Sequence, residues 1–221
     1  MDRLELLELF DEQMRRRRAP DGLFAGDGWS AVLWWPGEGD VEALVARLRE
    51  LPGHVEWKYY AHDEPADLPE RLLAAGLVPE DEETLLVADV EAIPPPPPEL
   101  DLRSEPAEFE ALALSVFGRG SATGFPATSR AVVAYVDGRP ASAGRVDLEP
   151  DSDFAGLFGG ATLPEFRGRG LYRATVAKRA ELARERGYRW LYVDALPTSR
   201  PILERLGFVA LTTTTPYVPQ A

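Results

Sequence analysis

Residues 164–173 read PEFRGRGLYR, and this stretch decides how the rest of the sequence is interpreted. Gly168 and Gly170 stand between a proline turn and a segment with helical periodicity. The first amides of a helix lack partners within the helix and lie at the positive end of its dipole, so they bind anions. Glycines let a diphosphate approach the backbone closely. Three arginines add positive charge: Arg167, Arg169 and Arg173. The stretch predicts a phosphate-binding loop, with a basic surface turn as the alternative.

The segments around this loop alternate between strand and helix patterns. An Asp-Gly turn at Asp137 lies between two apolar runs and predicts a hairpin. Ser104 is expected to cap a helix that ends at Gly118. The expected order of elements is a helix at 105–117, strands at 131–136, 140–149 and 154–163, a helix at 171–186, a strand at 188–196, a short helix at 201–206 and a strand at 208–215.

Charge and composition narrow the class of ligand. Residues 1–98 carry 22 acidic and 9 basic side chains, whereas residues 99–221 carry 15 of each. The segment 167–189 nevertheless holds eight bases and two acids. Such a local basic island indicates a small phosphorylated ligand more than a nucleic acid, which usually requires a basic face. The run Arg15–Arg18 is interpreted as favourable pairing with the dipole of an N-terminal helix.

The loop resembles the acyl-CoA loop of the GCN5-related N-acetyltransferase (GNAT) superfamily, written R/Q-x-x-G-x-G/A. The match runs from Arg167 to Tyr172, and Tyr172 departs from the family's glycine or alanine. Residues 160–166 (GATLPEF) and 202–208 (ILERLGF) extend the resemblance, which covers about 101–221. It implies an α/β (α+β) fold with a mixed sheet, the GNAT acyl-CoA N-acyltransferase fold.

The resemblance also implies a co-substrate, acetyl-CoA, and the residues that bind it. The strand before the loop is expected to separate from its neighbour so that the acyl chain passes between them, with Gly159-Gly160 permitting a bulge. Ser199 is expected to cap the short helix or to contact the cofactor. The implied cofactor-binding residues are Ala161, Thr162, Arg167, Gly168, Arg169, Gly170, Leu171, Tyr172, Arg173 and Ser199.

The catalytic groups are less well defined by the sequence. Leu203 occupies the position of the family's usual tyrosine acid, so Tyr192 or Tyr172 is the nearest hydroxyl, or the thiolate leaves without a protein acid, or catalysis has been lost. Glu149 and Asp194 are the candidate bases, and ordinary strand-end carboxylates are the alternative for each. Zero cysteines and two histidines argue against a metal site.

A proline run at 94–100 divides the chain. It predicts a linker between an N-terminal unit at 1–93 and an acetyltransferase domain at 101–221. Trp57 precedes Gly76 by 19 residues and Trp190 precedes Gly207 by 17, each across a strand-helix pattern. Residues 29–91 are therefore interpreted as a degenerate repeat of the second unit, with the acidic PGEGD (36–40) replacing the arginine-glycine loop.

Two classes of function remain open at this stage. The first is an acetyl-CoA-dependent N-acetyltransferase acting on a small amine, and the second is a non-catalytic acyl-CoA-binding or interaction module. Neither a nucleic-acid nor a membrane partner is expected, and a homodimer stays open. A charged N-terminus and the lack of a long apolar run predict a cytoplasmic location. The acceptor loops, such as 119–130, carry no recognisable motif.

Overall fold

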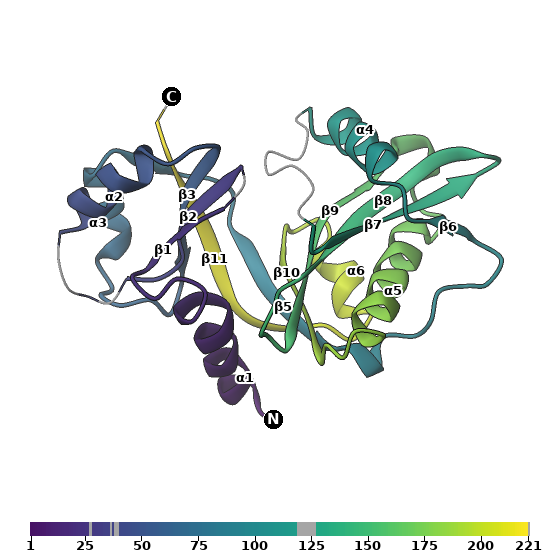
Figure 1. Cartoon of the computed structure of the whole chain (residues 1–221), viewed down its shortest axis with the longest axis horizontal. Helices are drawn as coiled ribbons and strands as arrows, with labels where there is room; N and C mark the ends of the chain where they lie inside the picture. Colours follow the sequence, from purple (N-terminus) through teal and green to yellow (C-terminus); the bar gives the residue numbers. More distant parts are fainter. Residues whose placement is uncertain (27, 36, 38–39, 119–126, 221) are drawn as a thin grey trace.

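The computed structural model describes residues 1–221 except 27, 36, 38–39, 119–126 and 221. Its strands form one mixed sheet that runs through the whole molecule, in the order β1-β2-β3-β11-β5-β10-β9-β8-β7-β6, with β4 paired to β11 (Figure 1). The mixed α/β fold expected from the sequence is confirmed. Several acceptor-loop residues fall outside the described part of the chain.

The elements of the first half have these bounds: α1 Arg3–Phe10, η1 Asp11–Arg16, β1 Leu23–Ala25, β2 Trp29–Val32, α2 Val41–Arg49, β3 His54–Tyr60, α3 Leu68–Ala74, β4 Leu77–Pro79, β5 Glu83–Asp89 and η2 Val90–Ala92. Those of the second half are β6 Asp101–Arg103, α4 Pro106–Phe117, β7 Ser129–Val136, β8 Arg139–Leu148, β9 Phe154–Thr162, η3 Pro164–Phe166, α5 Leu171–Arg184, β10 Trp190–Ala195, α6 Arg200–Glu204 and β11 Val209–Pro219.

The second half places one long helix on each face of its strands. Alternation along β7 turns Val133 toward α4, where it packs with Phe109, while Ala134 lies on the opposite face with Leu171 of α5. The hairpin turn has positive φ at both Asp137 and Gly138, as expected for an Asp-Gly turn.

The helix α4 begins one residue later than expected. Its N-cap is Glu105, which makes no capping hydrogen bond, so the prediction that Ser104 caps this helix is wrong. Pro106 at the first helical position explains this start, because its missing N–H needs no partner there. Gly118 ends the helix in the left-handed conformation with φ 69°, as expected.

The last strands of the two halves are exchanged. Strand β5 of the first half pairs antiparallel with β10, whereas β11 of the second half pairs antiparallel with β3 (Figure 1). The two exchanged strands also pair with each other. Each half therefore completes its sheet with a strand that the other half supplies, so the proline run separates the halves in sequence but not in the sheet.

The N-terminal segment closes one face over this junction. Helix α1 continues into the six-residue π-helical stretch η1, and Phe10 packs edge-on against Phe154 and Tyr192 at ring-centroid distances of 5.5 and 5.3 Å. Asp2 caps α1 through a complete capping box with Glu5. A π-helical turn shifts the side chains that follow it, and here it brings Arg15 to a buried position.

Candidate active site

The arginine-glycine loop joins β9 to the first turn of α5. Gly168 and Gly170 have φ of 76° and 78°, values that favour glycine, and a Cβ at either position would meet no atom within 4 Å. Gly170 is the N-cap of α5, and no side chain of the described residues caps this helix end. The open first-turn amides therefore face free space, which suits an anion.

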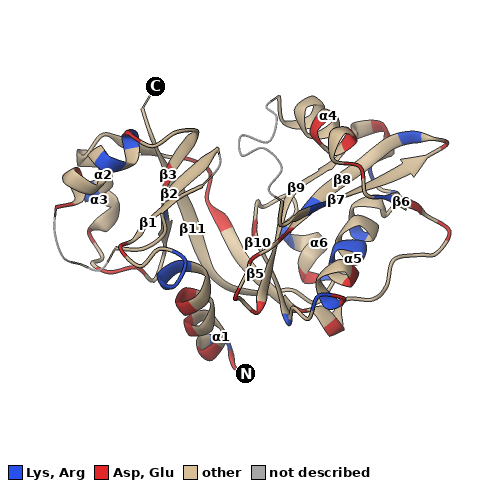
Figure 2. Cartoon of the chain, in the orientation of Figure 1, with Lys and Arg blue, Asp and Glu red and all other residues tan. Residues whose placement is uncertain are grey.

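The loop arginines surround this helix end. Arg167 donates from Nε to the carbonyl of Thr162 at 3.2 Å, and the Arg169 guanidinium lies 5.5 Å from the Phe166 ring centroid. Both arginines are exposed, as is Arg173. Figure 2 marks further basic residues along α5.

Tyr172, which replaces the small residue of the family pattern, turns inward. Its ring fills the space beside Gly160, where a Cβ would lie 2.7 Å from a ring carbon. Burial raises the pKa of the Tyr172 phenol, while the hydrogen-bonded Arg179 acts in the opposite direction. Gly160 thus accommodates the larger side chain.

The strands β9 and β10 separate beyond a short parallel pairing. Tyr192 is paired with Gly156, and beyond this pair the two strands share no further register. The pairing of β8 with β9 shifts between Ala143 and Arg145, opposite Gly159, which has φ 60°. The bulge expected at Gly159-Gly160 is therefore present, and the opening between β9 and β10 begins beside Phe158 and Asp194.

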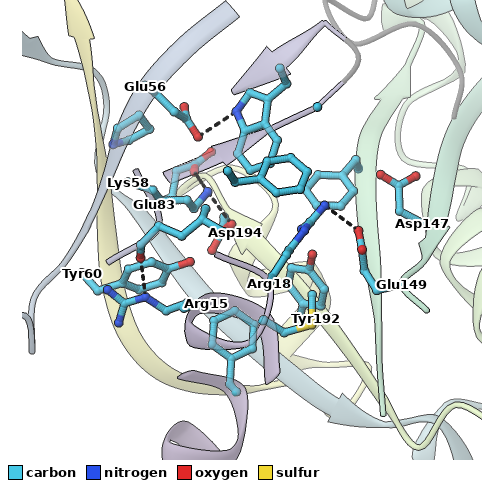
Figure 3. A pocket seen from close by; sticks show the side chains of 18 of the residues that line it. Arg15, Arg18, Glu56, Lys58, Tyr60, Glu83, Asp147, Glu149, Tyr192 and Asp194 are labelled. Carbon is cyan, nitrogen blue, oxygen red and sulfur yellow. Dashed lines mark hydrogen bonds and ion pairs between the residues drawn. The ribbon is translucent and has the colours of Figure 1, made fainter. Parts of the chain in front are cut away.

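A cavity of about 540 Å³ lies at this opening, between the two halves. Figure 3 shows its lining from close by. None of the residues 161–173 lines it, so the arginine-glycine loop is not part of the cavity wall. The first half contributes Phe10, Met14, Arg15, Arg18, Phe24, Trp29, Glu56, Lys58, Tyr60 and Glu83, among others, and the second half contributes Arg145, Asp147, Glu149, Phe158, Tyr192 and Asp194, among others.

All three expected catalytic residues line this cavity. Glu149 follows β8 and pairs with Arg18 at 2.8 Å, and burial raises the pKa of its carboxyl against the opposing effect of Arg18. Burial also raises the pKa of Tyr192, which keeps the phenol protonated at neutral pH. Asp194 pairs through Oδ2 with Lys58 Nζ at 2.6 Å.

Several lining residues were not anticipated from the sequence. Arg15 and Arg18 were interpreted as helix-dipole partners. Arg15 does lie in the last turn of η1, but the ion pairs that both arginines make were not indicated by the sequence. Arg15 is buried in ion pairs with Asp11 and Asp63 at 2.9 and 2.5 Å, and Arg18 reaches across to Glu149.

Strand β3 carries a second set of unanticipated residues. His54, Glu56, Lys58 and Tyr60 all line the cavity. The sequence held a signal for them, because polar side chains at every second position of a strand share one face.

Two remaining expectations concern the short helix α6. Ser199 makes no capping hydrogen bond and instead donates from Oγ to the carbonyl of Leu196 at 3.2 Å, so the capping prediction is wrong. Leu203, at the family's tyrosine position, is fully buried in the main core and cannot reach the cavity. The hydroxyl that the family resemblance implied is therefore absent at position 203, where the side chain serves the core.

Comparison with known proteins identifies the class that this fold and site define. Residues 90–208 match the family model described as "Acetyltransferase (GNAT) family". The chain therefore belongs to the GNAT family of acetyltransferases, whose members use an acyl-CoA co-substrate. It has no significant match among curated protein sequences.

Solved structures share the fold at low sequence identity. A GCN5-related N-acetyltransferase from Kribbella flavida has a TM-score of 0.65 at 18% identity, covering 87% of this chain and 81% of that one. A GNAT-family acetyltransferase from Novosphingobium aromaticivorans has a TM-score of 0.62 at 22% identity, with coverages of 89% and 86%. A tandem GNAT protein from the clavulanic acid biosynthesis pathway has a TM-score of 0.55 at 19% identity, with coverages of 88% and 76%.

Two further observations concern metal and membrane. The described residues contain no group of three or more His, Cys, Asp or Glu side chains placed to hold a metal ion. Among the same residues, no helix combines the length and apolar character that spanning a bilayer requires.

Proposed function

We propose that the protein transfers the acetyl group of acetyl-CoA to a small amine held in the cavity between its two halves. The observation that carries this proposal is the position of the cavity. It lies where β9 and β10 separate, on the face of the sheet opposite to the one that α5 covers. Acetyl-CoA entering from the loop would present its thioester to an amine in the cavity.

The co-substrate side of the site is assigned to the loop and the strand before it. The diphosphate would lie on the first-turn amides of α5, close to Gly168 and Gly170. The arginines of the loop would balance its charge. The acyl arm would run along β9 past Ala161 and Thr162. Leu171, Tyr172 and Ser199 are assigned supporting contacts with the co-substrate.

Three cavity residues are assigned the chemical steps. The amine nitrogen attacks the thioester carbon, so a C–N bond forms and the C–S bond breaks. Glu149, whose pKa is raised by burial, accepts the proton that the ammonium group must lose. Tyr192, protonated at neutral pH, donates to the leaving thiolate. Asp194 holds the ammonium group beside the opening.

We also infer that residues 29–91 are a degenerate copy of the second half. The order β3-α3-β5 parallels β10-α6-β11, and each first strand pairs with the other half's last strand. A parallel pair precedes the exchanged strand in both halves, β2 with β3 and β9 with β10. The similarity to a tandem GNAT protein supports this view.

The buried Leu203 favours a second candidate, an acyl-CoA-binding protein without transferase activity. One experiment separates the two candidates. Acetyl-CoA binding is measured by calorimetry, and turnover with a panel of small amines is followed by release of free thiol. Binding together with amine-dependent thiol release is expected. Binding without thiol release, across the panel, would support the non-catalytic candidate, and loss of both would contradict the proposal.

A further inference from the structure

One wall of the cavity, formed by β3, β5 and β10, carries an unequal set of charges. Lys58 on β3 lies between two carboxylates, with its Nζ 2.6 Å from Asp194 Oδ2 and 3.9 Å from Glu83 Oε2 (Figure 3). Burial acts to lower the pKa of Lys58, but Asp194 together with Tyr60, Glu56 and Glu83 outweighs it, and the pKa lies well above the ordinary value. The lysine is therefore charged, and one cation serves two acids.

Asp194 has an oxygen with no partner. Its side chain is 6% exposed, and its Oδ1 is buried without a hydrogen-bond donor among the described residues. A buried carboxylate oxygen that accepts no hydrogen bond loses its hydration without compensation, at a cost of about 1–3 kcal/mol or more. Because Asp194 lines the cavity, a ligand that brings a donor there would remove this cost.

The other cations of the cavity are already engaged. Arg15 is held by Asp11 and Asp63, and Arg18 is held by Glu149. Arg145 lies 3.1 Å from Asp147. Glu149 and Asp147 thus have guanidinium partners, whereas Asp194 and Glu83 share a single ammonium group. A ligand cation is expected at this pair and not at the opposite wall.

Aromatic side chains line the same cavity and determine what kind of group can accompany the cation. Trp29, Phe158 and Tyr192 line the same cavity, and the Phe158 and Tyr192 rings meet edge-on at a centroid distance of 5.9 Å. Such rings accept an apolar body and attract a cation at their faces.

We propose that Asp194 and Glu83, held in place by Lys58, form a site for the ammonium group of a monoamine whose remaining part is apolar. Asp194 Oδ1 accepts from the ammonium group, Glu83 adds a second negative charge, and the aromatic wall covers the apolar body. The site is shared between the halves, because Asp194 comes from β10 and Glu83 and Lys58 come from β5 and β3. This inference rests on the proposed function for its role in catalysis, but binding can be tested without turnover.

The surroundings of Glu83 predict how binding depends on pH. Burial raises the pKa of Glu83 to about 7, with Lys58 acting against it and Asp194, Glu56 and Glu80 adding to it. Below this value Glu83 is largely neutral, and above it the carboxylate attracts a cation. Alkylamines remain protonated across this range, so their affinity should increase as pH rises from 6 to 8.

The test compares three ligands with one body and different head groups. Binding of hexylamine, hexanol and hexanoate to the full chain, without acetyl-CoA, is measured by calorimetry at pH 8. Hexylamine is expected to bind at least tenfold more tightly than hexanol, and hexanoate should show no binding. The affinity of a fourth ligand, 1,6-diaminohexane, should not exceed that of hexylamine, because Asp147 and Glu149 across the cavity are each already paired with an arginine.

Matched variants locate the site. Asp194→Asn and Glu83→Gln should each weaken the binding of hexylamine at least tenfold. Glu83→Gln should also remove the increase in hexylamine affinity between pH 6 and 8. The control is Glu82→Gln, which removes the same charge from an exposed neighbour that does not line the cavity. It should leave affinity unchanged.

Three outcomes would overturn the inference. These are equal affinity for hexylamine and hexanol, unchanged hexylamine affinity in both site variants, or tighter binding of the diamine. If Asp194→Asn does not fold, the ligand series and Glu83→Gln still decide. Amine binding without acetyl transfer would refute the proposed function alone. Transfer to amines that bind independently of both carboxylates would refute this inference and the role of Asp194, and would leave the acetyltransferase activity standing.

Discussion

At the scale of single residues, the two loop glycines carry the case for co-substrate binding. We expect Gly170→Val to weaken acetyl-CoA binding at least tenfold, about 1.4 kcal/mol, because a side chain would occupy the space before the first-turn amides. Gly37→Val is the matched control, since Gly37 has φ 79° against 78° at Gly170 and also has open space around its Cβ. Calorimetry measures both variants. Equal affinity for the Gly170 variant and the wild type would contradict the assignment of the loop.

The two cavity carboxylates should differ in their kinetic effects. Glu149→Gln is expected to lower kcat by about 10²-fold or more with little change in KM, because it removes the proton acceptor. Asp194→Asn should mainly raise KM, because it removes a contact with the ammonium group. Activity of the wild type should increase as pH rises through the raised pKa of Glu149, since only the carboxylate accepts a proton. The Glu149 variant should lack this increase. If Glu149→Gln instead raised KM and Asp194→Asn lowered kcat, Asp194 would be the proton acceptor and Glu149 the residue that contacts the ammonium group.

At the scale of elements, the bulge in β9 is expected to be sensitive to the addition of a single methyl group. A Cβ at Gly159, where φ is 60°, would lie 2.7 Å from Phe109 Cζ, whereas a Cβ at Gly138, where φ is 74°, meets no atom within 4 Å. Gly138→Ala should cost about 1 kcal/mol from its backbone conformation alone. We expect Gly159→Ala to cost at least twice as much and to lower Tm by roughly 4 °C or more. Thermal unfolding of both variants tests this, and equal losses would show that α4 yields to the added methyl group.

The elements that the sequence predicted well are those fixed by local chemistry. The hairpin at Asp137 follows from a turn that needs positive φ, and α5 follows from its apolar spacing and the glycine before it. The exchange of β5 and β11 was not predicted. Which strands pair depends on the packing of distant segments and produces no pattern in the local sequence. Alternation along β3 marks Lys58 as one of a set of polar side chains on one face, but the sequence does not show that this face and Glu83 of β5 meet at the same cavity.

At the scale of the whole molecule, the exchange predicts that neither half folds alone. A fragment of residues 101–221 would leave β10 without β5 and β11 without β3, and so expose two sheet edges. We expect this fragment and residues 1–100 each to lack cooperative unfolding, and to regain it together with acetyl-CoA binding when mixed. Circular dichroism and size-exclusion chromatography provide the readouts. A monomeric fragment of 101–221 that unfolds cooperatively would show that the proline run bounds an independent domain.

The distribution of charge gives a second prediction at this scale. The acidic first half lies on one side of the cavity and could attract cationic acceptors over distances beyond the Debye length, about 8 Å at physiological ionic strength. We expect kcat/KM for an amine to fall as salt increases at saturating acetyl-CoA. If kcat/KM does not change with salt concentration, the acidic half does not attract acceptors over long distances and contributes only local contacts and solubility.

The position of β11 in the sequence also determines when the sheet can form completely during synthesis. Strand β3 is made early, but its partner β11 begins at Val209, near the end of the sequence. At about 5–20 residues per second, the interval between β3 and β11 lasts on the order of ten seconds. Throughout this time the edge of β3 stays open to pairing with a neighbouring nascent chain. The wall that holds Lys58 is therefore secured only once β11 has been made, and a chain interrupted before β11 would have an incomplete acceptor cavity.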